Sequence, residues 1–316
     1  MPFNPKRTVE RFLKKNPDVY TIVVTGAYGR KSAIRALGLI LGQVATVTMG
    51  VNPKIVPDVV IFDYKSSADF PDFEPDVVVV TSCRNDEQAE RFFGLANKAG
   101  AVFVNFNDVA QHFATHLKNP EVTTYGDELP AHYYFENHDF SLEGYEGDFV
   151  NPEREHIPAK IRVLGEHNIR PITMAVAVAK YFGMDRKDIL KGVADITPLH
   201  GRMSPARGLH GSIIIDDSSY ISVDAVHNGI KTIEQLESSA KMVITNNVQK
   251  VNTLDMGLLT DVVILGEKPK GEPEHPKVHY FDNELDLIHY VGTRLEPDGI
   301  VLLEIPLPEI IQSYLW

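Results

Sequence analysis

A glycine-rich turn carries the strongest chemical signal in the sequence. The turn reads TGAYGRKS and connects an apolar segment to a stretch with helical spacing. Gly26 and Gly29 let the backbone N–H groups of the turn face inward, and the start of the following helix adds partial positive charge. Arg30 and Lys31 supply two cations, and Ser32 supplies a hydroxyl. This pattern predicts a polyphosphate site, and the alternative is a tight turn with a solvated basic pair.

Charge and cysteine content exclude several classes of protein. The 316 residues include 43 acidic and 31 basic side chains, so the formal net charge is −12. That sign is wrong for a protein that follows a nucleic-acid backbone. Cys83 is the single cysteine, which excludes an intrachain disulfide and a cysteine-rich zinc site. Because Asp86 and Glu87 follow it, we do not expect a thiolate nucleophile.

Histidine is the other common metal ligand, and its positions form no clear motif. Of the 12 histidines, His275 and His279 are four residues apart, the spacing that places two ligands on one helix face. Pro276 directly follows His275, so the pair is not expected to share a helix. A metal hydrolase is therefore the weakest of the functional alternatives.

Short apolar runs rich in β-branched residues recur in the first half of the chain. They are continuous rather than alternating, as in strands of a parallel sheet that is covered on both faces. The expected strands are 20–25, 44–48, 58–63, 76–81 and 101–105, and the expected helices are 31–43, 86–99 and 108–117. This repetition of strand and helix predicts a doubly wound α/β fold. The glycine-rich turn follows the first strand.

The second half predicts a small excursion and then a second α/β pattern. Residues 122–162 predict an antiparallel edge, and helices are expected over 171–182 and 185–194. The stretch 197–211 is rich in Gly, Pro and Arg and predicts a linker. Strands are then expected at 212–215, 242–245, 261–265, 277–281 and 300–304, with helices at 222–236 and 284–295. We expect a P-loop-type, mostly parallel central domain over 1–205 and a smaller α/β domain over 206–316.

Six motifs in the same order resemble the Mur ligase family, the ATP-dependent enzymes that add amino acids during peptidoglycan precursor assembly. The glycine-rich turn is similar to the family's T-G-[TS]-[NY]-G-K-[TS]-[TS]. The other matches are Thr81–Glu87 to T-N-x-x-x-D-H, Val102–Asp108 to V-x-N-x-D-D, Gly165–Asn168 to G-x-H-N, Gly201–Met203 to G-R-[MF] and Ile215–Tyr220 to I-D-D-S-Y-N. After about residue 225 the chain resembles the family's Rossmann-like C-terminal domain only in its α/β pattern, and no motif matches there.

The resemblance implies ATP and Mg²⁺ as cofactors and a role for each site residue. It implies phosphate contacts for Gly26, Gly29, Ser32 and Arg202, an adenine contact for Asn168, a ribose contact for Asp217, catalytic phosphate clamping by Arg30 and Lys31, and Mg²⁺ ligands at Ser32, Asp63 and Glu87. Simpler alternatives stay open for three of these residues. Asn168 could cap the helix that follows it, Arg202 could be a solvated linker residue, and Asp217 could end a strand together with Asp216.

The chain departs from the family pattern where phosphoryl transfer would take place. Arg30 stands at the family's Lys and Lys31 at its Mg²⁺-binding hydroxyl. In an alternative register one residue is inserted, so that Arg30 bulges and Lys31 and Ser32 take the two positions. Asp63 replaces a Glu and Glu87 a His, and both keep oxygen atoms suited to Mg²⁺.

Other family features have no counterpart in the sequence. Lys98 lies too close to the next strand to match the lysine that many members carbamylate, and residues 304–306 replace the family's K-G-S. Only about 20 residues precede the first strand, so the family's N-terminal UDP-binding domain is expected to be absent.

Two functions remain as alternatives. The first is an ATP-dependent carboxylate–amine ligase that forms an acyl phosphate in the synthesis of peptidoglycan or a similar cell-wall precursor, with a small-molecule, peptide or glycan precursor as substrate. The second is a pseudoligase that binds nucleotide weakly or not at all and acts with a protein partner. No nucleic-acid or membrane partner is expected. No apolar run approaches the roughly 20 residues of a membrane span, and a cytoplasmic protein is predicted.

Overall fold

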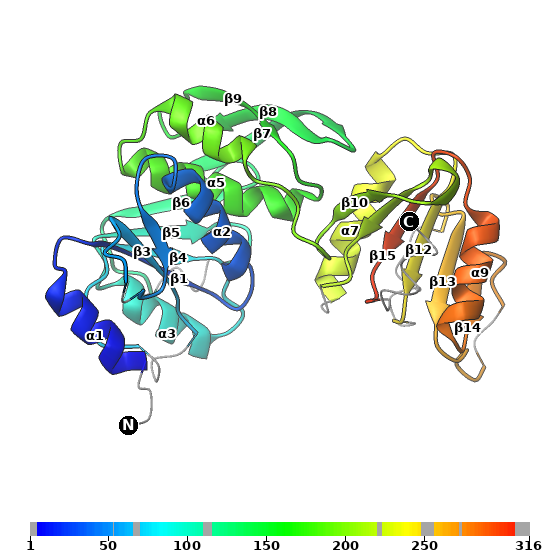
Figure 1. Ribbon diagram of the computed structural model, residues 1–316, viewed down its shortest axis with the longest axis horizontal. Helices are drawn as coiled ribbons and strands as arrows, with labels where there is room; N and C mark the ends of the chain where they lie inside the picture. Colours follow the sequence, from blue (N-terminus) through cyan, green and yellow to red (C-terminus); the bar gives the residue numbers. More distant parts are fainter. Residues whose placement is uncertain are drawn as a thin grey trace. The chain divides into compact units, whose positions relative to one another are not determined.

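The chain folds into two compact units, each built around its own sheet (Figure 1). The computed structural model describes residues 5–52, 54–65, 70–109, 116–219, 223–247, 256–271 and 274–306. The first unit contains residues 1–139, 146–161 and 167–196, and the second contains 140–145, 162–166 and 197–316. Both units combine helices with a mostly parallel sheet, so the predicted α/β fold class is confirmed.

The sheet of the first unit has nine described strands in the order β2-β3-β1-β4-β5-β6-β7-β8-β9. Their bounds are β1 Tyr20–Thr25, β2 Val47–Met49, β3 Val59–Asp63, β4 Val77–Val80, β5 Ala101–Asn105, β6 Val122–Gly126, β7 Tyr133–Ser141, β8 Gly144–Val150 and β9 His156–Ile161. Neighbouring strands from β2 to β7 pair in parallel. Continuous apolar runs such as the four valines of β4 are fully buried, which is why these strands showed no alternation.

Two expectations about this sheet need correction. The second strand begins at Val47 rather than at residue 44. The segment 122–162 lies at one edge of the sheet, as expected, but it is no separate excursion, because β6 pairs in parallel with β5, and β7 pairs in parallel with β6. Its strands extend the main sheet, and β7 and β8 are joined by a tight turn at residues 142–143.

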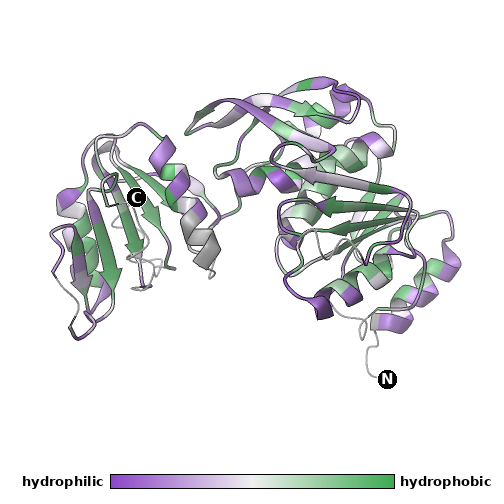
Figure 2. Ribbon diagram, turned by 180° about the vertical axis from the view of Figure 1, so that it is seen from behind, coloured by the Kyte–Doolittle hydropathy of each residue, from purple (hydrophilic) through white to green (hydrophobic). Residues whose placement is uncertain are grey.

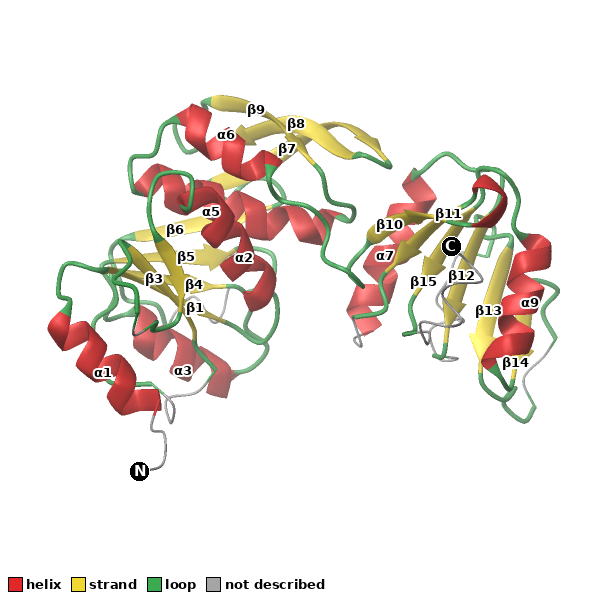
Figure 3. Ribbon diagram, in the orientation of Figure 1, coloured by secondary structure: helices red, strands yellow, loops and turns green. Residues whose placement is uncertain are grey.

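Helices cover both faces of the central strands (Figure 3). The described helices of this unit are α1 Pro5–Lys15, α2 Arg30–Leu41, α3 Asp86–Ala96, α5 Ile169–Tyr181 and α6 Arg186–Ala194. Phe12 of α1 and Phe92 of α3 share a core with Val23 and Val78 of the sheet, whereas α2 packs with α5 and α6 on the other face. The charged helix α1 was not predicted, and most of the helix expected over 108–117 lies outside the described residues.

The second unit has a six-stranded sheet in the order β10-β11-β15-β12-β13-β14. Its strands are β10 Ser204–Arg207, β11 Ile213–Asp216, β12 Lys241–Thr245, β13 Asp261–Leu265, β14 Val278–Phe281 and β15 Ile300–Leu303. All pairs are parallel except β10 with β11. The helix α7 (Val223–Gln235) packs Ile230 and Ile233 on one face of this sheet, and α9 (Glu284–Arg294) packs Leu287 and Val291 on the other.

The stretch expected to be a linker belongs in part to the second sheet. Residues 204–207 form β10, which pairs along β11. The second unit begins its long segment at Thr197, so the boundary expected after residue 205 lies inside a strand. Backbone pairing of the Pro- and Arg-containing segment with β11 is a non-local contact that local composition does not encode.

Hydropathy follows the layers of each unit. The strands are predominantly hydrophobic, and the outer faces of the helices are hydrophilic (Figure 2). Among the described helices, none combines the length and the apolar character that crossing a bilayer requires.

Candidate functional site

The glycine-rich turn packs directly on the end of the neighbouring strand β4. Gly26 has a φ of 138° and Gly29 a φ of 82°, values that residues with a side chain rarely adopt. A Cβ atom built on Gly26 would lie 2.8 Å from the Ser82 nitrogen and closer still to the Thr81 hydroxyl. Both glycines are therefore required by the shape of the turn.

Polar groups after β4 hold the turn in this shape. The Ala27 N–H donates to the Ser82 carbonyl at 3.3 Å, and the Tyr28 N–H donates to Ser82 Oγ at 2.9 Å. The Thr81 hydroxyl donates to the carbonyls of Thr25 and Tyr28. These two N–H groups thus already have acceptors within the protein, and an anion would have to use the amides at the start of α2.

The start of α2 offers such amides. Gly29 is the N-cap residue and provides no side-chain acceptor, so the first-turn N–H groups lack the usual cap. They also carry the positive end of the helix dipole. Lys31 is exposed on this turn and adds a full positive charge. This arrangement suits a phosphate group.

Arg30 turns its side chain back onto the glycine-rich turn. Its Nε donates to Asp63 Oδ1 at 2.6 Å, and its Nη1 donates to the Gly26 carbonyl. Only 20% of the Arg30 side chain is exposed. Arg30 is also the first residue of α2, and the Ala33 N–H donates to the Gly29 carbonyl at 3.1 Å to close the first helical turn. The alternative register with a bulged Arg30 is therefore not what the structure contains.

A second group of polar side chains, which we call the Arg170 network, supports the turn from the other side. The Tyr28 hydroxyl donates to Asp108 Oδ1 at 2.9 Å. Asp108 Oδ2 accepts from Arg170 Nη1 at 2.9 Å and from Asn105 Nδ2 at 2.7 Å. Arg170 also binds both carboxylate oxygens of Asp127, at 2.8 and 2.6 Å. The network joins the turn, the end of β5 and the start of α5.

Two side chains of this network, Tyr28 and Arg170, have shifted pKa values. Burial raises the pKa of Tyr28, and the Asp108 carboxylate raises it further. Burial lowers the pKa of Arg170, but the hydrogen bonds and charges of Asp127 and Asp108 outweigh that effect and raise it overall. Arg170 and Asp127 were not predicted as site residues. An arginine in the first turn of the otherwise apolar α5 was the available signal, because such a residue needs a buried partner.

The expected Mg²⁺ ligands do not form a donor set. The Asp63 carboxylate at the end of β3 is ion-paired with Arg30, and its second oxygen lies 3.9 Å from Lys65 Nζ. Glu87 lies exposed in the first turn of α3. In the part of the chain that is described, no three His, Cys, Asp or Glu side chains group in a way that could hold a metal ion. Because Asp63 already binds a cation, the residues present do not fit Mg²⁺.

Asn168 and Cys83 both belong to the first unit. Asn168 occupies the N-cap position of α5, but its side chain makes no capping hydrogen bond, so the simple capping role is not supported. Its adenine contact stays a prediction. Cys83 is buried, and burial raises the pKa of its thiol, which fits the expectation that it is no nucleophile.

Arg202 and Asp217 belong to the second unit. Asp217 is 2% exposed and follows β11, and its Oδ1 accepts from the Met203 N–H at 3.1 Å. Burial is the main cause that raises the pKa of Asp217 to about 8, while the Met203 hydrogen bond and Arg202 lower it. The Asp217 side chain thus binds the backbone of the turn at Gly201–Met203, a contact that was not predicted from the sequence. Contacts of Asp217 with ribose and of Arg202 with phosphate stay predictions.

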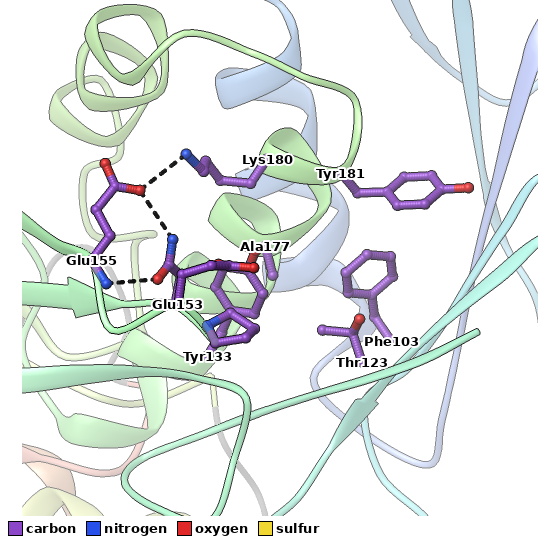
Figure 4. Close-up of a pocket in the computed structure, with 10 residues that line it drawn as sticks. Phe103, Thr123, Tyr133, Glu153, Glu155, Ala177, Lys180 and Tyr181 are labelled. Carbon is purple, nitrogen blue, oxygen red and sulfur yellow. Dashed lines mark hydrogen bonds and ion pairs between the residues drawn. The ribbon is translucent and has the colours of Figure 1, made fainter. Parts of the chain in front are cut away.

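A separate cavity of about 490 Å³ lies in the first unit. Figure 4 shows the rings of Phe103 and Tyr181 on one side and the ion pair of Lys180 with Glu155 on the other, at 3.3 Å. The cavity adjoins the end of α5, where Phe182 contacts Tyr20, the first residue of β1. The glycine-rich turn follows the last residue of β1, so the cavity lies at the opposite edge of the sheet and is not part of the phosphate site.

Comparison with known proteins gives one consistent family. The model of the Mur ligase middle domain matches residues 87–179. UDP-N-acetylmuramate--L-alanine ligase of Chelativorans sp. is 28% identical over 142 residues, which cover 42% of this chain and 29% of that protein. The enzyme of the same name from Caulobacter vibrioides is 24% identical over 197 residues, covering 56% and 40%. The chain thus spans less than half the length of these curated relatives.

Solved structures extend the likeness of fold to nearly the whole chain. The MurF ligase of Thermotoga maritima in complex with ADP has a TM-score of 0.74 at 14% identity, and the match covers 99% of this chain and 83% of that one. The folylpolyglutamate synthetase of Lactobacillus casei has a TM-score of 0.70 at 15% identity and is covered to 92%. The matched family model, the sequence relatives and the fold agree with the six motifs, and together they support a member of the Mur ligase family whose residues 87–179 match the family's middle domain.

Proposed function

We propose that the chain binds an adenine nucleotide through its polyphosphate at the start of α2 and acts as an ATP-dependent carboxylate–amine ligase on a peptidoglycan or similar cell-wall precursor in the cytoplasm. One observation carries the nucleotide site. Two glycines with left-handed φ values lead from the end of β1 into a helix without a side-chain cap, and an exposed lysine lies on its first turn. The likeness to a MurF ligase solved with ADP supports the same assignment.

The residues of the site have distinct roles in this proposal. The first-turn amides of α2 and Lys31 would bind the phosphates. Arg30 would lie beside the transferred phosphoryl group and offset its charge. The ligase chemistry would join a carboxylate to an amine through an acyl phosphate. The Arg170 network would keep the turn in one conformation, so that little ordering is needed when the nucleotide binds.

A second function is favoured by a specific observation. Asp63 is ion-paired with Arg30 instead of being available to a metal. The positions that differ from the family pattern are those of phosphoryl transfer, whereas the turn itself is intact. This supports a pseudoligase that binds nucleotide and acts through a partner. The two functions share the nucleotide site and differ in turnover.

The first experiment measures binding of a fluorescent ADP analogue to the wild type and to Lys31→Ala. Loss of one charge-assisted contact should weaken binding about tenfold. Lys65→Ala is the matched control, since Lys65 is exposed and lies 3.9 Å from Asp63, and it should change the affinity less than about twofold. Equal effects of the two substitutions would contradict the assignment.

The second experiment separates the two functions by turnover. Formation of ADP from ATP is measured with UDP-muramyl peptides as carboxylate donors and with amino acids as amines. ADP formation that requires both substrates supports the ligase. Tight nucleotide binding without turnover for any pair supports the pseudoligase.

A further inference from the structure

We propose that Arg30 takes the place of a divalent metal ion at the glycine-rich turn, so that the turn binds a nucleoside polyphosphate without Mg²⁺. The inference rests on the proposed function in one respect, because it assumes that the polyphosphate binds at the start of α2. It goes beyond that function by removing a cofactor that such loops ordinarily use.

The position of the guanidinium carries the proposal. Asp63 is the last residue of β3, in register with Val24 one residue before the end of β1, so its carboxylate lies beside the turn. Arg30 bridges this carboxylate and the Gly26 carbonyl. A metal ion at this place would use the same two kinds of ligand, a carboxylate oxygen and a backbone carbonyl oxygen. The guanidinium thus occupies the contacts that would hold a cation.

The hydrogen-bonding capacity of Arg30 is not used up by these contacts. Nε and Nη1 are the two nitrogens that bind Asp63 and Gly26. Among the described residues, Nη2 has no hydrogen-bond partner. A guanidinium has five donors in a planar fork, so donors remain for a phosphate oxygen while Asp63 stays bound. One side chain can therefore connect the carboxylate to the phosphate, as a bridging metal ion would.

The surrounding charges favour an anion and disfavour a second cation. Asp63 contributes one negative charge, and Arg30 offsets it at 2.6 Å. Lys31 is exposed on the first turn of α2 and adds a further positive charge. A divalent ion that bound Asp63 would meet the guanidinium within a few ångströms and would be repelled. In the usual arrangement a hydroxyl follows the loop's cation and binds the metal, whereas here that position is Lys31.

The test compares binding of the fluorescent ADP analogue to the wild type in excess Mg²⁺ and in excess EDTA. We expect the two dissociation constants to agree within about twofold. Binding that is more than about tenfold weaker in EDTA would overturn the inference and leave the proposed nucleotide site intact. Binding in neither condition would overturn both. The wild-type comparison needs no variant, so it does not depend on the folding of a mutant.

A variant pair gives a second, opposite expectation. In Arg30→Ala the Asp63 carboxylate is released and the fixed charge is lost, so binding in EDTA should weaken about tenfold and added Mg²⁺ should recover part of the affinity. Arg84→Ala is the control, because Arg84 lies on the Tyr28 ring, 4.7 Å from its centroid, and not at Asp63. It should leave the ratio of the two affinities at the wild-type value. A Mg²⁺ response in the control equal to that in Arg30→Ala would count against the inference.

Discussion

Replacing Arg170 tests whether the Arg170 network stabilises the first unit. The substitution Arg170→Met keeps most of the side-chain volume and removes three charge-assisted hydrogen bonds, to Asp108 and to both oxygens of Asp127. Two carboxylates are then left near each other without the cation. The side chain of Arg170 is 22% exposed, that of Asp108 19% and that of Asp127 34%. Water therefore offsets part of the free-energy cost of leaving the two carboxylates unpaired.

The expected loss of stability follows from these values. Breaking a buried pair by removing one partner costs about 3–5 kcal/mol, and exposed pairs contribute about 0–1 kcal/mol. The partial exposure places this network toward the lower end of the buried range, at about 3 kcal/mol. The free energy of unfolding is measured by urea denaturation followed by circular dichroism. Because two units can unfold separately, hydrogen exchange of the peptides around 101–109 and 169–181 assigns the loss to the first unit.

A matched control variant shows whether burial of the network causes the loss of stability. Lys98 and Asp72 form an equally short ion pair of 2.6 Å, but they are 47% and 84% exposed, so Lys98→Ala should leave the urea midpoint within error of the wild type. A loss below about 1 kcal/mol in Arg170→Met, or a loss equal to that of the control, would refute the argument from burial. A loss of stability confined to the second unit would refute the assignment of the network to the first unit.

Three further predictions concern other parts of the two units. Gly26→Ala should destabilise the protein by about 2–5 kcal/mol, because Gly26 has a positive φ and an added Cβ would collide with the end of β4. Gly94→Ala is the control: Gly94 lies in α3 with open space around it, so the substitution should stabilise the protein by about 0.5–1 kcal/mol. Equal shifts of the melting temperature in the two variants would contradict the argument from strain at Gly26. Asp217 has a pKa raised to about 8, so its folded form keeps the proton that the unfolded chain loses near pH 4. The free energy of unfolding should therefore fall as the pH rises from about 4 to 8, by about 1.4 kcal/mol per pH unit at most. In Asp217→Asn the urea midpoint should lack this dependence on pH. The same pH dependence in Asp217→Asn and in the wild type would refute the raised pKa of Asp217. Asn283 caps α9 by accepting from the Asp286 N–H at 2.9 Å, so Asn283→Ala should cost about 1 kcal/mol in thermal unfolding, and Asp282→Ala, outside the helix, should cost clearly less.

The order of elements could be predicted because apolar runs dominate it. The bounds of β1 and β5 coincide with those expected, since each is a continuous buried run between polar residues. The extension of the sheet by β6 and β7 could not be predicted, because the partner of a strand is a non-local choice that its own residues do not specify. The same reason explains β10, whose pairing with β11 turns an expected linker into part of a sheet.

The backbone conformation of the glycine-rich turn was predicted from the sequence, whereas the side-chain contacts around it were not. The glycines were identified because their conformational freedom is a local property, and both adopt positive φ values. The pairing of Arg30 with Asp63 was not predicted, because it depends on β3 lying beside β1. Arg170 and Asp127 are 43 residues apart in the chain, so only the fold brings them together. The side-chain partners of this site therefore follow from topology.

The hydrogen bonds that hold the glycine-rich turn in place bear on whether nucleotide binding and turnover go together. Ser82 and Thr81 bind the backbone of the turn from one side, and Tyr28 ties it to Asp108 from another. These contacts fix the turn before any ligand arrives, so loss of a metal ligand need not mean loss of phosphate affinity. In the proposed ligase reaction the Arg30–Asp63 ion pair would lie beside the transferring phosphoryl group, where charge develops. Nucleotide binding and turnover can therefore be tested separately, and turnover is the measurement that distinguishes the proposed ligase from the proposed nucleotide-binding pseudoligase.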